Sequence, residues 1–507
     1  MKIKKIIVLF CGCVVLLITN VFAQQTVQMK EQYRPQIHFS PQKNWMNDPN
    51  GMVYLNGVYN LFFQYNPYSS VWGPMHWGHA TSKDLIHWQR QPIAIYPDSL
   101  GTIFSGSAVL DKNNTSGLGK KGQAPLVAIF TQHDTVGEKA GKNDFQNQSI
   151  AYSVDEGKTW IKYSGNPVLK NPGLRDFRDP KVMWFEPQKK WIMTLAANNI
   201  VIFYSSPDLK NWTRESEFGK DYGAHGGGWE CPDLIALDGK GTPRWVLIVN
   251  LNPGAPNGGS GTQYFVGNFD GTTFTSDQKE TKWLDYGPDN YAGVTWSNTG
   301  KRKILIGWMT NWQYANLVPT EKWRSAMTIP RELKLKHVDN DIFIVSQPVT
   351  ELAEIERKRV TITNLAAKGK VDLSKQIGEI KFPCRINIKV AALKDFSLLF
   401  SNNAGDKLIL GYDKKENQYF IDRSISGKTA FQKDFAAKHT AHRIAKSPQM
   451  NMSLVIDVSS IELFADDGLT EMTEIFFPNK PYNQLHLLSD ENMLIKKLEY
   501  CRLKSIW

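Results

Sequence analysis

Three acidic residues, far apart in the sequence, lie in short motifs that could hold a carboxyl group in place for catalysis. Asp48 and Asp179 each precede a proline, and proline fixes its own φ and restricts the residue before it. Glu230 lies beside Trp229, after a run of glycines, and an apolar wall there would favour the protonated carboxyl group. Taken singly, each motif is also typical of an ordinary surface turn. Together, an ionised and a protonated carboxyl group about 5 to 5.5 Å apart could hydrolyse a glycosidic bond with retention of configuration.

The residues around these acids match the needs of a sugar-binding pocket. Arg178 precedes Asp179, and its positive charge would keep that carboxylate ionised. The chain has 16 Trp and 18 Tyr, whose flat faces can cover the apolar C–H faces of sugar rings. His76 and His79 lie in a Trp-rich segment without an accompanying set of carboxylates or cysteines. We therefore predict that they are structural or bind substrate, and that the protein uses no metal and no cofactor.

The elements that must position these residues are predicted to be strands. Short runs of β-branched and aromatic residues, separated by Gly, Pro, Asn and Asp clusters, follow one another from Trp45 to about Pro330, and no long amphipathic helix interrupts them. The runs expected to form strands include Met52–Phe63, Leu126–Thr131, Trp191–Ala196, Trp245–Asn250 and Ile304–Trp308. This pattern indicates an all-β fold.

A Ser- and Asp-containing turn that ends in an aromatic residue recurs in this region. Its copies lie at 82–88, 153–160 and 206–212, with a weaker copy at 268–274. We interpret each copy as a turn between two outer strands. Repetition at this spacing fits four-stranded propeller blades, and a segment of about 300 residues would hold about five of them. Chance recurrence of common turn residues is less favoured, because three copies share both Asp and Trp.

The pattern changes at residues 347–359, which are rich in Glu and Arg and compatible with a helix. Beyond them, alternating runs again predict strands, with a hairpin turn at 466–468. These runs are Ile386–Val390, Phe396–Phe400, Met452–Val458 and Ile461–Phe464. We predict an N-terminal five-bladed β-propeller over 24–346, a linker over 347–359 and a C-terminal β-sandwich over 360–507.

The N-terminus has the features of a secretory signal peptide over residues 1–23. Three lysines precede an apolar run from Ile6 to Ile18, and small residues end at Ala23, where we expect cleavage. The run is short for a membrane span, which needs about 20 residues. Cys11 and Cys13 lie inside the run, so lipid anchoring is the weaker alternative. We expect an exported protein, periplasmic or secreted, with no membrane span in the mature chain.

Charge and cysteine content exclude other classes of function. The formal net charge is +11, but charges of both signs are interspersed, so no nucleic acid partner is indicated. Outside the signal peptide only Cys231, Cys384 and Cys501 remain, which is not a disulfide framework. The fold must therefore depend on its hydrophobic core, and nothing in the sequence indicates an oligomeric state.

The acidic motifs, in this order on a five-blade pattern, resemble glycoside hydrolase family 32, the invertases, inulinases, levanases and fructan exohydrolases. The motifs that carry the resemblance are Trp45–Gly51, Arg178–Pro180, Glu230–Pro232, Phe62–Pro67, Phe104–Ser107 and Trp323–Met327. The resemblance implies that Asp48 attacks the anomeric C2 of fructose, that Glu230 is the acid and base, and that Asp179 holds the fructose ring hydroxyls. It also implies that the following residues bind substrate: Asn47, Gln64, Trp72, Phe104, Ser107 and Arg178. Trp312 is a further candidate, which either closes the pocket or packs between blades.

Two other functions fit parts of this pattern. A family 43-type furanosidase, acting on arabinan or xylan, shares the five-blade design but inverts configuration with carboxyl groups farther apart. A non-catalytic fructan-binding protein could keep the fold without the reaction. Within the favoured function, levan, inulin, fructo-oligosaccharides and sucrose all stay open as substrates. We expect attack at chain ends, which is the commonest mode in the family.

Overall fold

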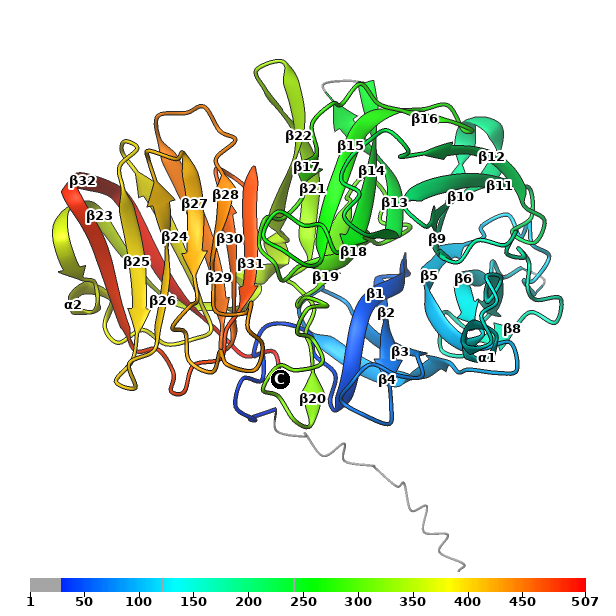
Figure 1. The fold of residues 1–507 in the computed structure, drawn as a ribbon, viewed down its shortest axis with the longest axis horizontal. Helices are drawn as coiled ribbons and strands as arrows, with labels where there is room; N and C mark the ends of the chain where they lie inside the picture. Colours follow the sequence, from blue (N-terminus) through cyan, green and yellow to red (C-terminus); the bar gives the residue numbers. More distant parts are fainter. Residues whose placement is uncertain (1–28, 121, 240–241) are drawn as a thin grey trace, which may run out of the picture.

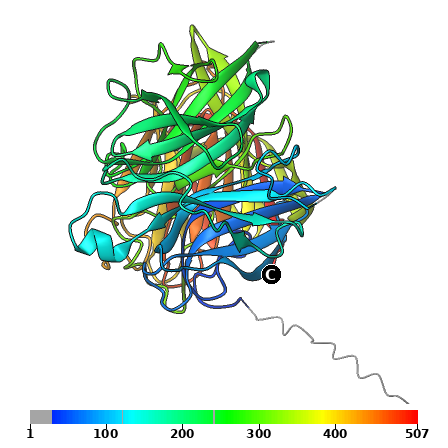
Figure 2. The ribbon, with the colours of Figure 1, turned by 90° about the vertical axis from the view of Figure 1, so that its right-hand side faces the viewer.

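The structure, a computed structural model, describes residues 29–120, 122–239 and 242–507, and consists almost entirely of strands. Two β domains lie side by side (Figure 1), with the sheets of residues 44–348 on one side and those of residues 356–503 on the other. The view turned by 90° places the first domain in front of the second (Figure 2). The predicted signal peptide, 1–23, lies outside the described residues.

The first domain consists of five antiparallel sheets, each built on four strands in chain order, which are the blades of a propeller. Blade one contains β1 (Asn44–Leu55), β2 (Val58–Asn66), β3 (His76–Ser82), β4 (Trp88–Ile95) and the added β20 (Trp323–Arg324). Blade two contains β5 (Thr102–Leu110), β6 (Leu126–His133), β7 (Gln146–Ser153) and β8 (Ile161–Lys162). Blade three contains β9 (Phe177–Phe185), β10 (Lys190–Ala197), β11 (Ile200–Ser206) and β12 (Thr213–Phe218).

Blade four contains β13 (Gly228–Gly239), β14 (Thr242–Asn252), β15 (Gly261–Phe269), β16 (Phe274–Thr275) and the added β17 (Lys282–Trp283). Blade five contains β18 (Tyr291–Thr295), β19 (Ile304–Trp308), β21 (Arg331–Val338) and β22 (Asp341–Pro348). The helices among the described residues are short: α1 (Thr135–Lys139), η1 (Glu186–Gln188), η2 (Thr350–Ile355) and α2 (Ser374–Ile377). None of these described helices is long and apolar enough to cross a bilayer. The prediction of a five-bladed propeller is confirmed.

One predicted strand was wrong. The run Met52–Phe63 is a hairpin, because β1 ends at Leu55 and β2 begins at Val58. Asn56 and Gly57 form the turn with φ values of 49° and 84°, a conformation that asparagine and glycine adopt more easily than other residues. The four other predicted runs in this domain each lie inside one observed strand.

The recurring Ser–Asp turns join the third and fourth strands of blades one to four, as the sequence predicted. In blade one, Ser82 Oγ donates to Asp84 Oδ1 at 2.9 Å, and the same oxygen accepts the backbone N–H groups of Ile86 at 3.0 Å and His87 at 2.8 Å. Asp155 and Asp208 make equivalent bonds in the next two blades. The aspartate thus satisfies backbone donors that the turn would otherwise leave unpaired.

The innermost strand of every blade contains a β-bulge near its N-terminal end. At each bulge, two residues of the inner strand lie opposite one residue of the second strand. The bulged pairs are Asn47–Asp48, Phe104–Ser105, Asp179–Pro180, Cys231–Pro232 and Ala292–Gly293. A bulge bends the strand and re-aims a side chain. Proline is tolerated in two of these pairs because the bulge interrupts the hydrogen-bond ladder.

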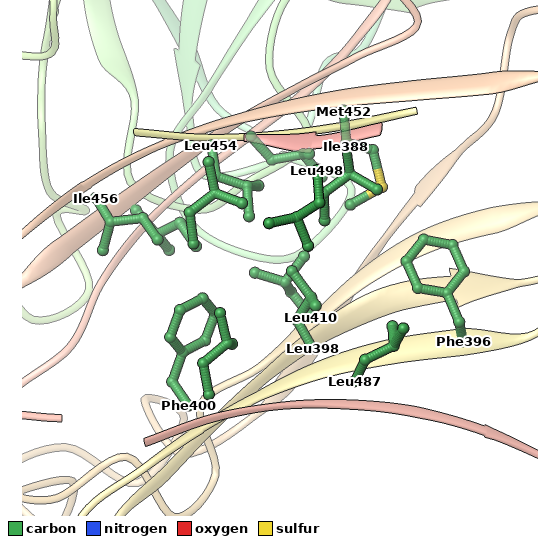
Figure 3. Close-up of a cluster of buried hydrophobic side chains, with 14 of the residues drawn as sticks. Ile388, Phe396, Leu398, Phe400, Leu410, Met452, Leu454, Ile456, Leu487 and Leu498 are labelled. Atoms are coloured by element: carbon green, nitrogen blue, oxygen red, sulfur yellow. The ribbon is translucent and has the colours of Figure 1, made fainter. Parts of the chain in front are cut away.

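The second domain is a β-sandwich whose two layers share the long strand β32 (Gln484–Leu503). Residues 484–488 of β32 pair with β25, and its C-terminal half pairs with β24. The remaining strands are β23 (Glu356–Asp372), β24 (Cys384–Val390), β25 (Phe396–Ser401), β26 (Lys407–Asp413), β27 (Gln418–Asp422), β28 (Lys438–His442), β29 (Met450–Asp457), β30 (Ser460–Ala465) and β31 (Thr470–Ile475). Apolar side chains from both layers meet in its core (Figure 3). The residues of the predicted linker, 347–359, cover the end of β22, η2 and the start of β23.

Buried ion pairs join the two domains. Arg331 of β21 donates to Asp285 at 2.9 Å, and across the interface it donates to Glu471 at 2.7 Å and to Glu462. His38, which precedes β1, contacts the sandwich carboxylates Asp457 at 2.8 Å and Glu462 at 2.7 Å. Each of these side chains is at most 2% exposed. Because unpaired buried charges are costly, the pairs fix the relative position of the domains.

Candidate active site

A cavity of about 270 Å³ lies where the bulged ends of the inner strands converge. Nine of the ten predicted site residues line it, and the exception is Ser107. The nine are Asn47, Asp48, Gln64, Trp72, Phe104, Arg178, Asp179, Glu230 and Trp312. A larger cavity of about 650 Å³, lined by residues such as Lys181, Asp233 and Thr295, lies further along the same inner strands, but none of the three acids lines it. The three acids therefore meet in the smaller cavity.

Asp48 reaches the cavity from the bulge of β1 and is held by three donors. Ser105 Oγ donates to its Oδ2 at 2.7 Å, Asn47 Nδ2 to its Oδ1 at 3.0 Å, and the Cys231 thiol lies 3.6 Å from Oδ2. Burial, together with the negative charge of Glu230, raises the pKa of Asp48, while the bonds from Ser105 and Asn47 lower it. These bonds orient the carboxylate and stabilise its ionised form.

Asp179 lies at the bulge of β9 with a φ of 66°, a left-handed conformation that is uncommon for residues other than glycine. Its Oδ2 accepts the backbone N–H of Cys231 at 3.0 Å, and its own N–H donates to Thr131 Oγ1 at 3.0 Å. Burial raises the pKa of Asp179 to about 7; Arg178 opposes the rise, and Glu230 and Asp48 add to it. Arg178, with its Nε 4.0 Å from Asp179 Oδ2, lowers this pKa as expected, but burial has the larger effect.

Cys231 lies between the two aspartates, with its sulfur 3.6 Å from Oδ2 of each. Burial and the surrounding carboxylates raise the pKa of this thiol well above its ordinary value. The thiol therefore stays protonated and is a weak hydrogen-bond donor rather than a nucleophile. It links Asp48 of blade one to Asp179 of blade three.

Glu230 has polar neighbours in place of the expected apolar wall. Arg178 Nη2 donates to its Oε1 at 2.8 Å, and the Tyr291 hydroxyl donates to its Oε2. The adjacent Trp229 points away and is fully buried, with its indole N–H bonded to Ala224 O at 2.9 Å. The prediction about the surroundings of Glu230 was wrong, because neighbouring side chains on a strand point to opposite faces.

The rest of the lining combines aromatic faces with polar groups that have spare hydrogen-bonding capacity. Trp72 is 44% exposed at the mouth, and Trp312 stacks on Trp45 with ring centroids 5.9 Å apart. Gln64 lies opposite the bulge of β1 and is 2% exposed, and its Nε2 has no hydrogen-bond partner among the described residues. Because buried polar groups are normally hydrogen-bonded, a ligand oxygen or a water is expected to accept a bond from this amide. The cavity therefore offers a sugar both aromatic faces and hydrogen-bond donors.

The predicted role of Ser107 needs a correction, because this residue does not line the cavity. It is buried beside blade three, where its Oγ donates to Pro180 O at 2.9 Å and accepts the Val182 N–H at 3.0 Å. Its hydroxyl is thus used between blades two and three and does not reach a ligand. Ser105, two residues earlier, lines the cavity and bonds Asp48. Side chains alternate along a strand, but the bulge at 104–105 breaks that alternation, which the sequence alone did not show.

Several residues in or beside the cavity were not predicted from sequence. Tyr291 begins the inner strand of blade five and contacts Glu230; its place could have been found by requiring each blade to supply a residue there. The other residues line the cavity, and no motif indicated them: Met75, His133, Glu138, Phe145, Gln146, Arg175 and Asp176. Among the described residues, no group of three or more His, Cys, Asp or Glu side chains is arranged to hold a metal ion.

Comparison with known proteins gives the family. Residues 38–348 match the sequence model of the glycosyl hydrolases family 32 N-terminal domain, and residues 349–501 match that of the family 32 C-terminal domain. A levanase from Bacillus subtilis (strain 168) is 46% identical over 510 residues, which cover 97% of this chain and 74% of the levanase. The family 43-type alternative is thereby set aside.

Solved structures agree with this match. An exo-inulinase from Aspergillus awamori has a TM-score of 0.86 and 37% identity, and the match covers 94% of this chain and 100% of that one. A β-fructofuranosidase from Schwanniomyces occidentalis, solved with fructosyl-erythritol, has a TM-score of 0.85 and 32% identity, with coverage of 95% and 99%. The chain belongs to glycoside hydrolase family 32.

Proposed function

We propose that this protein hydrolyses the β-fructofuranosidic bonds of fructans, fructo-oligosaccharides or sucrose by double displacement, releasing fructose from chain ends. The observation that carries the proposal is the meeting of three carboxyl groups, from blades one, three and four, in one cavity. The names of the similar proteins, a levanase, an exo-inulinase and a β-fructofuranosidase, agree with it. The cavity, at about 270 Å³, is at the low end for ligand sites and favours a terminal sugar unit over a long chain segment.

In the first step Asp48 attacks C2 of the terminal fructosyl unit. The C2–O bond to the leaving group breaks, Glu230 gives its proton to the departing oxygen, and a covalent fructosyl-enzyme forms. Ser105 and Asn47 orient the attacking carboxylate. Arg178 and Tyr291 stabilise the negative charge that appears on Glu230 as its proton leaves.

In the second step Glu230, now ionised, takes a proton from water while the water oxygen attacks C2 and releases Asp48. Asp179 accepts hydrogen bonds from ring hydroxyls and stabilises the cationic character of both transition states. Gln64, with its free amide N–H group, and the aromatic faces of Trp72, Phe104 and Trp312 hold the ring. Two inversions at C2 give net retention.

Export fits this function, because fructans are large and are cleaved outside the cell. We propose that residues 1–23 direct export and are removed after Ala23. N-terminal sequencing of the protein recovered outside the cytoplasm tests this, and a mature chain that still begins at Met1 would contradict it.

The experiment that tests the reaction is a time course on levan, inulin and sucrose with Asp48→Asn and Glu230→Gln as variants. The wild-type protein should release free fructose, β anomer first, without a ladder of oligosaccharides. Each variant keeps the shape of the side chain, so both should melt like the wild type while losing at least about a thousandfold in kcat, the size expected for members of a catalytic unit. The α anomer appearing first would indicate inversion, and a protein that binds fructan but releases no fructose would be a binding protein.

A further inference from the structure

One buried side chain of the β-sandwich bonds two side chains of the propeller. Arg423 follows β27 and is fully buried. Its Nη1 donates to Asp289 Oδ2 at 2.6 Å, and its Nη2 donates to the Tyr314 hydroxyl at 2.9 Å. Tyr314 in turn donates to Asp289 Oδ1 at 2.5 Å. Since Asp289 and Tyr314 belong to the propeller, the three groups form a closed hydrogen-bonded triangle across the domain interface, which we call the Arg423 clamp.

Tyr314 lies in the segment from 309 to 320 between β19 and β20, here called the Trp312 loop. Trp312 lines the cavity and stacks on Trp45 at an interplanar angle of 29°. Further along the loop, Asn316 Oδ1 accepts the backbone N–H of Trp72 at 2.9 Å. The loop therefore carries one tryptophan of the cavity wall and holds the backbone of the other.

The first part of the loop is fixed by the propeller itself. The Asn311 side chain donates to Pro288 O at 2.8 Å, and the Trp312 N–H donates to Ser260 Oγ at 3.2 Å. Beyond these residues, Tyr314 is the member of the loop that bonds the sandwich, and it is 1% exposed. Its hydroxyl makes two hydrogen bonds to charged groups, which are stronger than bonds between neutral groups.

We infer that the Arg423 clamp positions the Trp312 loop, so that the β-sandwich sets the aromatic wall of the cavity; this rests on the proposed function. Arg423 and Tyr314 act as positioning residues for substrate binding, because neither lines the cavity. A sugar ring gains most from an aromatic face that is already in place, since ordering the face on binding costs free energy. Loosening the clamp should therefore weaken substrate binding more than it slows the chemical steps.

Tyr314→Phe is the test variant, because it removes only the hydroxyl and keeps the ring against Phe435, 5.1 Å away between centroids. Arg423 and Asp289 still pair with each other in this variant. KM for sucrose and for inulin should rise roughly three- to tenfold, the range of indirect couplings of this kind, while kcat stays within about twofold. Quenching of tryptophan fluorescence by fructose should need a correspondingly higher fructose concentration.

Thr473→Val is the matched control. Thr473 Oγ1 donates to Asp285 at 2.6 Å and accepts from Arg331 at 2.7 Å, at the same interface but away from the Trp312 loop. It loses a buried hydroxyl with two partners, as Tyr314→Phe does. The control should lower the melting temperature by a similar amount and leave KM within twofold of the wild type.

The route through Trp312 is tested by combining Tyr314→Phe with Trp312→Ala. If the clamp acts through this side chain, Tyr314→Phe should change KM much less in the Trp312→Ala background, because coupled residues are not additive. Full additivity, a KM change below twofold for Tyr314→Phe, or an equal KM rise in Thr473→Val would overturn the inference. A wild-type protein that releases no fructose would instead refute the proposed function.

Discussion

Ser105→Ala should impair the protein on the acid side of its pH range. Ser105 is 4% exposed, and its hydroxyl donates to Asp48 Oδ2 at 2.7 Å. A hydrogen bond to a charged group contributes about 1.5 to 3 kcal/mol, here to the ionised form of Asp48. Since Asp48 must be ionised to attack C2, the variant should lose roughly 10- to 100-fold in kcat/KM at pH values where the carboxylate is already partly protonated.

Removing the Ser105 hydroxyl should raise the pKa of Asp48. The bond from Ser105 lowers the pKa of Asp48, against burial and the charge of Glu230, which raise it. Without the bond this pKa rises, so the acid limb of the kcat/KM profile, which reports the free enzyme, moves to higher pH. On the plateau above the limb the loss should be much smaller, because Asp48 is ionised there with or without Ser105.

The assay is the pH profile of kcat/KM for sucrose, followed by release of glucose and fructose, with Ser107→Ala as the control. Ser107 lies in the same strand, but its hydroxyl bonds the backbone of Pro180 and Val182 instead. Its removal should lower the melting temperature, because two buried backbone groups lose their hydrogen-bond partner, which costs about 1 to 3 kcal/mol. The acid limb of the pH profile should stay in place. The reasoning would be refuted if the acid limb of the kcat/KM profile did not move in Ser105→Ala, or if it moved equally in Ser107→Ala.

Two further predictions concern Tyr291 and the domain interface. Tyr291→Phe removes a donor to Glu230 and should lower kcat for sucrose by roughly tenfold. The loss should be smaller for a nitrophenyl fructoside, because its leaving group needs little protonation. Equal losses on both substrates would mean that Tyr291 has only a packing role. Burial opposes the charge on His38, but bonds to Asp457 and Glu462 outweigh it and raise the pKa of His38 to about 9. His38 therefore stabilises the fold fully below its unfolded pKa of about 6.5 and loses this contribution as the pH rises through about 9. Calorimetry should show a larger fall in Tm over that range for the wild type than for His38→Gln, and parallel curves would contradict this.

Much of the fold could be predicted because its signals are local. The Ser–Asp turns around Asp84, Asp155 and Asp208 mark the outer edges of blades, since an aspartate that bonds the next backbone N–H groups defines its turn without help from the rest of the fold. The hairpin turn at 466–468 was also visible in the sequence, and both Asp466 and Asp467 have positive φ there. The acids stood out because proline restricts the backbone beside Asp48 and Asp179, and because a run of glycines precedes Glu230.

What the sequence missed depends on geometry between distant segments. Tyr291 has no motif of its own, and only the packing of blade five against blade four brings it to Glu230, 61 residues earlier. Ser105 and Ser107 could not be told apart, because the bulge that separates their directions arises from pairing with β6. The effect of burial on the pKa of Asp179 was missed for a related reason: a neighbouring arginine is visible in the sequence, but the burial that opposes it is not.

The five bulges also constrain how such a site can change. Because successive side chains on a strand face opposite ways, deleting one residue of the pair Asn47–Asp48 would turn the residues before it, including Trp45, through half a turn and out of the core in which they are buried. Substituting a bulge residue leaves the directions of the neighbouring side chains unchanged. In this scaffold, therefore, inserting or removing a residue in an inner strand would disturb the buried core, whereas exchanging a side chain at a bulge would change the cavity and leave the core in place.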